Sequence, residues 1–271
     1  MNSTFIVLRE QIQNFYLVRR LSTFELRSEN RNNYLGFLWE LINPSIQIGI
    51  YYFVFGFGIR AGRDVPMEYL GKVKFFYWML AGIVVWFFVS QAVLLASKSI
   101  YTRIGMISRM SFPMSVIPSV VIATKFYQHL LITALVFVIL QFTHYHVSIY
   151  LIQIPYYMFS LLALTLSFSL ITSTLATIVR DTQMVVQSLI RVLMYLTPIL
   201  WQPNEKIIQW VFKINPLTYV VEGYRYSLLG GEWYFVHHAY YTLYFWIVVI
   251  VMFIMGSALH VKFRNRFVDY L

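Results

Sequence analysis

The sequence predicts an all-α integral membrane protein with six transmembrane helices, on the basis of its composition and its apolar runs. Of the 271 residues, 59% are hydrophobic and only 12% are charged, against about 45–50% and about 25% in ordinary soluble domains. A bilayer core about 30 Å thick needs about 20 mainly apolar helical residues per crossing. Six windows meet this need: 36–58, 75–97, 114–141, 153–179, 183–201 and 238–260.

The distribution of basic residues predicts the orientation. Lys and Arg in short flanking segments resist translocation and so mark the cytosolic side. With the N-terminus inside, cytosolic segments hold twelve Lys and Arg residues and outer segments hold seven. Both termini are therefore expected in the cytosol, and residues 263–271 form a short cytosolic tail. The net charge of +10 indicates anionic lipids or an anionic substrate rather than nucleic acid, since no base-reading module is present.

Residues 1–34 are predicted to form an N-terminal interfacial segment. They are too charged to be a cleaved signal peptide. Within them, residues 5–28 carry apolar side chains at three- and four-residue spacing, interleaved with arginines. Those side chains are Phe5, Leu8, Ile12, Phe15, Val18 and Leu21. This pattern is typical of an amphipathic helix lying on the inner leaflet.

The transmembrane domain, residues 35–262, opens with LGFLWELINP and contains two stripes of polar side chains. The first stripe, on the first span, consists of Glu40, Asn43, Gln47 and Tyr51. The second, on the fifth span, consists of Gln183, Gln187, Arg191 and Tyr195. Polar groups inside spans are energetically expensive. Two such faces could line one hydrated pathway, or they could form buried hydrogen bonds between helices.

Lys125 is a charged residue within the third span. It lies twelve residues into that span, or about 18 Å at 1.5 Å per residue. An ammonium group at this position needs water or a partner. Glu40 is the candidate partner by charge.

Residues 98–112 join the second and third spans and carry three basic residues and no acid, with Pro113 closing the loop. Isoleucines at 100, 104 and 107 fall on one side of a helix. A short helix parallel to the membrane fits this pattern, and an ordinary basic cytosolic loop fits it equally well.

Residues 202–234, between the fifth and sixth spans, are aromatic and interrupted by Pro, Asn and Gly. Two helices near 204–214 and 216–229 are expected, too short to cross and re-entrant-like in the outer leaflet. Glu222 and Arg225 are three residues apart and can pair along a helix at the outer rim.

No catalytic, metal-binding or nucleotide-binding pattern is present. The chain has no cysteine, no HExxH and no GxxxxGK[ST] loop. We therefore expect neither a catalytic site nor a bound cofactor in this chain, and energy for any driven process must come from elsewhere.

Six blocks in a fixed order make the chain resemble the membrane permeases of ABC-2 type polysaccharide exporters. The blocks are YLGFLWELINP, LAGIVVWFF, FPMSVIP, IVRD, LTPILW and INPLTYVVEGYRYSLL. Within that family, FYLVRRLSTFEL, FVFGFGIRAGRDV, ASKSIYTRIGMISRM and FTHYHVSIY are most similar to the wall teichoic acid branch of Gram-positive bacteria.

The resemblance implies a homodimer that works with two copies of a separate ATPase, which binds ATP and Mg²⁺. The complex would export an undecaprenyl-diphosphate-linked wall teichoic acid across the bacterial plasma membrane. The N-terminal helix and a coupling helix at 98–112 would contact the ATPase, and spans one and five would line the channel. The coupling residues would be Ile100, Arg103, Ile104, Met106, Ile107 and Arg109.

Arg19 and Arg20 have two interpretations within this scheme. They could receive the diphosphate of the lipid carrier, or they could anchor the helix to anionic lipid, at about 1 kcal/mol per basic residue. Three alternatives to teichoic acid export remain open. They are export of an O-antigen or capsule, a membrane enzyme acting on lipid-linked sugars, and a passive or ion-coupled carrier.

Overall fold

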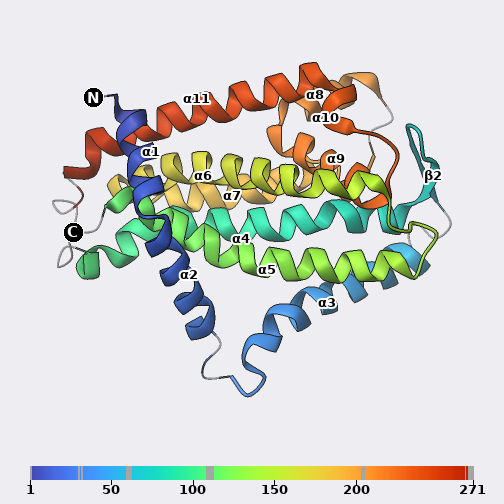
Figure 1. Cartoon of the computed structure of the whole chain (residues 1–271), viewed down its shortest axis with the longest axis horizontal. Coiled ribbons are helices and arrows are strands. Elements are labelled where there is room, and N and C mark those ends of the chain that lie inside the picture. Colours follow the sequence, from blue (N-terminus) through green and yellow to red (C-terminus); the bar gives the residue numbers. More distant parts are fainter. Residues whose placement is uncertain are drawn as a thin grey trace.

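The computed structural model describes residues 2–29, 31, 33–58, 63–107, 113–202, 205–265 and 267, without the side chains at 37, 104–107 and 206. Four long helices lie side by side along the longest axis of the molecule (Figure 1). They are α4 (Phe75–Ile107), α5 (Ile117–Gln141), α6 (Ile154–Ile178) and α11 (Ala239–Phe263). Short 3₁₀ turns lead into α5 at Met114–Val116 and into α6 at Ile149–Gln153.

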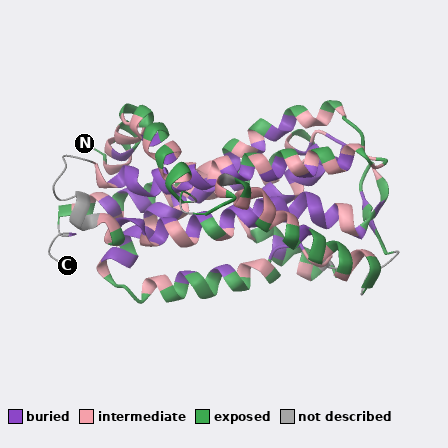
Figure 2. Cartoon of the chain, turned by 90° about the horizontal axis from the view of Figure 1, so that it is seen from below, coloured by how far each residue is buried: buried purple, intermediate pink, exposed green. Residues whose placement is uncertain are grey.

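These four helices are long and apolar enough to cross a membrane, and they coincide with four of the six predicted spans. The apolar stretches are Phe75–Arg103, Met114–Gln141, Ile149–Ile178 and Ala239–Phe263. Helix α4 lies at the centre, since 72% of its most apolar window is buried, whereas only 22% of the α11 window is. Figure 2 shows the buried residues concentrated along the middle of the bundle.

The other two predicted spans are shorter helices. The first window holds a 3₁₀ turn at Gly36–Leu38, helix α3 (Trp39–Tyr51) and a π-helix over Tyr52–Gly58. Pro44 lies inside α3 and has no N–H for the carbonyl of Glu40. The fifth window holds α7 (Thr182–Tyr195), which is only 14 residues long. Spanning by these two elements stays a prediction.

The N-terminal segment is two helices rather than one, α1 (Ser3–Gln13) and α2 (Phe15–Glu29), separated at Asn14. Together they cross one end of the bundle, and α1 also contacts α11 (Figure 1). We call this the terminal end, because both the N-terminal helices and the last turn of α11 lie there. The predicted apolar stripe is divided, because Val18 and Leu21 pack against Val116 and Val120 whereas its other four residues are exposed. Phe5, Leu8, Ile12 and Phe15 are 44–69% exposed.

At the opposite end, which we call the hairpin end, two short strands form an antiparallel hairpin that the all-α prediction missed. Strand β1 (Asp64–Met67) pairs with β2 (Gly71–Lys74) in the register Val65 to Val73. Tyr69 and Gly71 adopt positive φ angles of 66° and 70° in and beside the turn. The alternating burial of Val65, Met67 and Val73 against the bundle holds the hairpin in place.

The predicted short helices at this end are confirmed as α8 (Lys206–Ile214) and α9 (Pro216–Leu229), followed by the single turn α10 (Tyr234–His237). The Asn215 side chain caps α9 by accepting a hydrogen bond from the Leu217 N–H at 3.0 Å. Pro216 occupies the first helical position, where no N–H is needed. Most of α9 is buried, and it contacts α4, α6 and α11.

The prediction of a separate coupling helix at 98–112 is wrong for the described part of that segment. Residues 98–107 are the last turns of α4, which runs without a break from Phe75 to Ile107. Residues 108–112, including Arg109, lie outside the described residues. The helix continues because this stretch has no Gly or Pro except Gly105 and keeps its apolar side chains at helical spacing.

Gly223 supplies a testable packing constraint in α9. A Cβ atom there would lie 2.1 Å from the Tyr157 ring, so Gly223→Ala should cost roughly 3 kcal/mol, near the upper end of overpacking effects. Thermal unfolding of the purified protein measures this loss. Gly49→Ala in α3 is the control, because its Cβ would meet nothing within 4 Å. Equal unfolding temperatures for the two variants would contradict the α9–α6 packing.

Candidate functional site

At the terminal end, the N-terminal helices turn their acidic side chains toward the bundle. All three acids of this segment form ion pairs, each with a different helix. Glu10 pairs with Arg264 at 3.0 Å, Glu25 with Arg103 at 2.6 Å and Glu29 with Lys125 at 2.9 Å. We call these three pairs the terminal latch.

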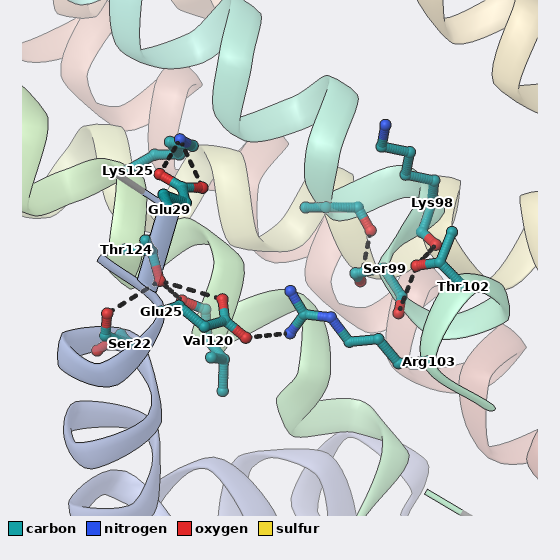
Figure 3. A network of polar contacts seen from close by, with 11 residues as sticks. Ser22, Glu25, Glu29, Lys98, Ser99, Thr102, Arg103, Val120, Thr124 and Lys125 are labelled. Atoms are coloured by element: carbon teal, nitrogen blue, oxygen red, sulfur yellow. Dashed lines mark hydrogen bonds and ion pairs between the residues drawn. The ribbon is translucent and has the colours of Figure 1, made fainter. Parts of the chain in front are cut away.

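The latch has additional hydrogen bonds that fix its geometry (Figure 3). Both Glu29 carboxylate oxygens accept from the Lys125 ammonium, at 3.0 and 2.9 Å, and Gln128 donates to one of them at 3.2 Å. The Thr124 hydroxyl lies 3.4 Å from the Ser22 carbonyl and from the Glu25 carboxylate. Helix α2 is thereby attached both to α5 and to the last turns of α4.

Lys125 is therefore satisfied by Glu29, and the expected pairing with Glu40 is wrong. Lys125 is only 8% exposed, so its ammonium needs a counter-charge. Helix α2 otherwise suits an anionic membrane surface, so its acidic side chains are best accommodated facing the protein. The presence of these acids is the sequence signal that points to the correct partner of Lys125.

The arginines of the N-terminal segment point the other way. Arg9, Arg19, Arg20, Arg27 and Arg31 are all exposed. The exposed apolar side chains of this segment lie among them, including Phe5, Ile12, Phe15 and Phe24. The outward face of α1 and α2 is thus both cationic and apolar, as an interfacial helix requires. Arg19 and Arg20 form no ion pair with any described residue.

Of the predicted coupling residues, the structure describes the side chains of Ile100 and Arg103. Ile100 is fully buried and packs with Ile117 and Phe267, so it positions the end of α4 and has no exposed surface for a partner. Arg103 is half-buried and held by Glu25. The side chains of Ile104, Met106 and Ile107, and all of Arg109, lie outside the described residues.

The polar stripe on α7 is divided. Gln183 donates to the Leu94 carbonyl at 3.1 Å and accepts from the Ser97 hydroxyl, so it binds α7 to α4. This matches the interhelical alternative. Gln187, Arg191 and Tyr195 instead lie on the exposed side of α7.

The polar stripe on α3 is largely open as well. Asn43 and Gln47 are exposed, and Glu40 and Tyr51 are partly buried. Both helices contact α4. The two stripes therefore lie on helices that pack against the same central helix of a single chain.

At the hairpin end, Arg225 is a buried connector rather than a rim residue. Its side chain is fully buried and pairs with Glu222 at 2.5 Å. Its Nε donates to the Trp78 carbonyl at 3.1 Å, another guanidinium nitrogen donates to the Pro198 carbonyl at 2.5 Å, and the group lies 3.4 Å from the centre of the Trp78 ring. Burial lowers the pKa of Arg225, and the Glu222 carboxylate opposes that shift.

Gly82 makes room for this guanidinium. A Cβ at Gly82 would lie 2.8 Å from an Arg225 nitrogen. The arrangement joins α9 to α4 and to the turn after α7. The i, i+3 spacing of Glu222 and Arg225 predicted their pairing, but nothing in the sequence pattern indicated their burial.

Comparison with known proteins shows the family of this chain. The ABC-2 type transporter family matches residues 16–229. The O-antigen export system permease protein RfbA of Myxococcus xanthus is 25% identical over 227 residues, covering 81% of this chain and 82% of the relative. Two proteins of the same name from Klebsiella pneumoniae are 24% and 26% identical over 262 residues, with 95% of each chain covered.

The family match covers α2 to α9, and so includes most of the latch, both polar stripes and the Arg225 connector. The chain therefore belongs to the ABC-2 type transporter family.

Proposed function

We propose that this chain is the membrane subunit of an ATP-driven exporter that moves a lipid-linked polysaccharide out of the cell. The chain is a multi-pass protein of the bacterial plasma membrane. The observation that carries the proposal is its similarity over 95% of its length to O-antigen export permeases. The similarity to O-antigen export permeases favours an O-antigen-type glycan as the substrate, and we propose that undecaprenyl diphosphate carries it.

The ABC-2 family implies an ABC ATPase partner, and the terminal end offers the surface for it. We propose that ATP-driven movement of two ATPase subunits acts on α2 and on the end of α4. The latch would pass that movement to α5, because Glu25 and Glu29 connect α2 to Arg103 and Lys125. ATP and Mg²⁺ would be bound by the ATPase.

We propose that two copies of this chain enclose the pathway, with α3 and α7 facing each other across it. In one chain, Asn43 and Gln47 of α3 and Gln187, Arg191 and Tyr195 of α7 are exposed alongside apolar side chains. Contact with a second copy would remove these side chains from lipid, where exposed polar groups are unfavourable. Water and sugar hydroxyls would then satisfy Asn43, Gln47 and Gln187.

The lipid carrier would approach at the outward face of α1 and α2. Its diphosphate is anionic, and Arg19 and Arg20 are exposed without a described ion-pair partner. A guanidinium group can donate two parallel hydrogen bonds to the oxygens of one phosphate. The same surface also suits ordinary anionic lipids. Comparing binding to vesicles with and without undecaprenyl diphosphate distinguishes carrier binding from anchoring to anionic lipid.

Arg191 distinguishes a phosphate-rich polymer from a neutral glycan. Wall teichoic acid is the second candidate substrate, and the exposed Arg191 on α7 favours it. If the polymer carries phosphates, Arg191→Glu should slow export by roughly tenfold, equivalent to about 1.4 kcal/mol, and Arg191→Ala should slow it less. Unchanged export by both variants in a reconstituted transporter would exclude contact with phosphate.

The test of the proposal is ATP hydrolysis by this chain copurified with its ATPase in lipid nanodiscs. We expect stimulation by an undecaprenyl-diphosphate-linked O-antigen glycan above that by the carrier lipid alone. Greater stimulation by a polyol phosphate polymer would keep the exporter and change the substrate to teichoic acid. Failure to bind any ATPase would rule out the mechanism.

A further inference from the structure

The side chain of Gln11 joins helix α1 to the start of α5, by which we mean the 3₁₀ turn at Met114–Val116 and the first turn of the helix. Its amide nitrogen donates to the Ser115 carbonyl at 2.8 Å, and its amide oxygen accepts from the Ser119 hydroxyl at 2.7 Å. Ser115 is fully buried and Ser119 is only 6% exposed. Buried polar groups need hydrogen-bond partners, and this one glutamine supplies two of them.

The residue before Gln11 connects the same place to a third helix. One carboxylate oxygen of Glu10 accepts from the Ser115 hydroxyl, and the other accepts at 3.0 Å from Arg264, which directly follows α11. A carboxylate at the start of a helix is also favoured by the helix dipole. Glu10 and Gln11 thus hold the start of α5 between α1 and the end of α11.

The contacts with α5 continue from α1 along α2. Val18 packs against Val116 and Val120, and Glu29 binds Lys125 farther along α5. The glutamine contact is the first of this series, because it involves the residues through which the chain enters α5. The N-terminal segment therefore follows the first half of α5 rather than touching it at one point.

The position of this joint in the chain gives it a role in passing on movement. Residues 108–112 connect α4 to the start of α5. Before them, Arg103 in the last turns of α4 is held by Glu25 at 2.6 Å. After them, Ser115 is held by Glu10 and Gln11. The N-terminal segment thus binds the chain on both sides of 108–112, and movement of α1 reaches the start of α5 through Gln11.

We infer that Gln11 is a positioning residue for export, because it makes α1 and the start of α5 move together. The inference rests on the proposed function for the source of the movement, an ATPase acting on the N-terminal segment. Gln11 does not itself contact the glycan. Without its two hydrogen bonds, α1 would move while the start of α5 stayed behind, and ATP hydrolysis would continue with less glycan exported.

The test measures the amount of O-antigen glycan exported per ATP hydrolysed by the reconstituted complex. Gln11→Leu removes both hydrogen bonds and should lower this ratio about fivefold, equivalent to about 1 kcal/mol. Gln13→Leu is the matched control, because it makes the same chemical change on the same helix at an exposed position. It should leave the ratio unchanged. A wild-type ratio in Gln11→Leu would overturn the inference.

A covalent bridge tests directly whether α1 and the start of α5 move together. The chain has no cysteine, so Gln11→Cys with Ser119→Cys gives a single reactive pair that a short bis-methanethiosulfonate reagent can join. With a cysteine-free ATPase, the unbridged pair should export as poorly as Gln11→Leu, and bridging should restore most of the export. If bridging instead stops export while ATP hydrolysis continues, or brings no recovery, α1 and α5 do not move as one and the inference is wrong.

Hydrogen exchange by the chain alone in nanodiscs examines the joint without an ATPase. Gln11→Leu should speed the exchange of backbone amides in the first turns of α5, because local opening there becomes easier, and Gln13→Leu should not. Unchanged exchange in Gln11→Leu would refute the inference. Faster exchange, combined with no export by the wild-type complex, would support the joint and refute the proposed function alone.

Discussion

Arg225→Leu is expected to destabilise the protein by about 3–5 kcal/mol, the usual loss when a buried ion pair is broken. The variant removes the partner of Glu222 and leaves the carbonyl groups of Trp78 and Pro198 without their donor. It also removes the contact with the Trp78 ring. For a chain of this size the loss corresponds to roughly 6–20 °C in unfolding temperature, which differential scanning fluorimetry in detergent measures.

Two further variants show whether the geometry or only the charge matters at Arg225. Lysine keeps the charge but cannot reach all three acceptors, so Arg225→Lys should fall between the wild type and Arg225→Leu. Arg191→Leu is the control, because this arginine is exposed and should change stability by less than about 0.5 kcal/mol. Equal stability of Arg225→Leu and Arg191→Leu would show that α9 is not held by this group.

Glu29→Gln is expected to reduce export by roughly tenfold, or about 1.4 kcal/mol in the barrier, with a smaller change in ATP hydrolysis. The substitution keeps the size of the side chain but leaves the Lys125 ammonium, which is 8% exposed, without its counter-charge. Helix α2 then loses its strongest attachment to α5. Transport and ATP hydrolysis measured on the same reconstituted complex give the ratio of the two.

The neighbouring latch pair supplies the control for this prediction. Glu25 and Arg103 are both more than a quarter exposed, and such pairs contribute only about 0–1 kcal/mol. Glu25→Gln should therefore have a milder effect. Combining Glu29→Lys with Lys125→Glu should recover part of the export. If Glu29→Gln exports as much glycan per ATP hydrolysed as the wild type, the latch does not transmit movement.

Much of the fold could be predicted because apolar length and loop chemistry are local properties. Four of the six apolar windows became the four long helices. Asn215 and Pro216 marked the start of α9 correctly, since a capping side chain and a proline at the first position suit a helix start. The hairpin was missed because its strands have four residues each, too few for a clear alternating pattern.

The site was harder to predict because its contacts join distant parts of the chain. Lys125 and Glu29 are 96 positions apart, and Arg225 and Trp78 are 147 apart. Charge alone could not choose between Glu29 and Glu40 as the partner of Lys125. The polar stripes were visible as spacing, but only the structure separates Gln183, which binds α4, from the exposed Gln187.

The most direct measurement follows a lipid-linked glycan across a bilayer. This chain and its ATPase would be reconstituted in liposomes loaded on one leaflet with an undecaprenyl-diphosphate-linked O-antigen glycan. A membrane-impermeant glycosidase would report the glycan reaching the other leaflet. ATP-dependent appearance that is lost on mutation of the ATPase is the predicted result. Movement of the glycan without ATP would contradict the account. So would a reconstituted complex that hydrolyses ATP but moves neither the O-antigen glycan nor a wall teichoic acid.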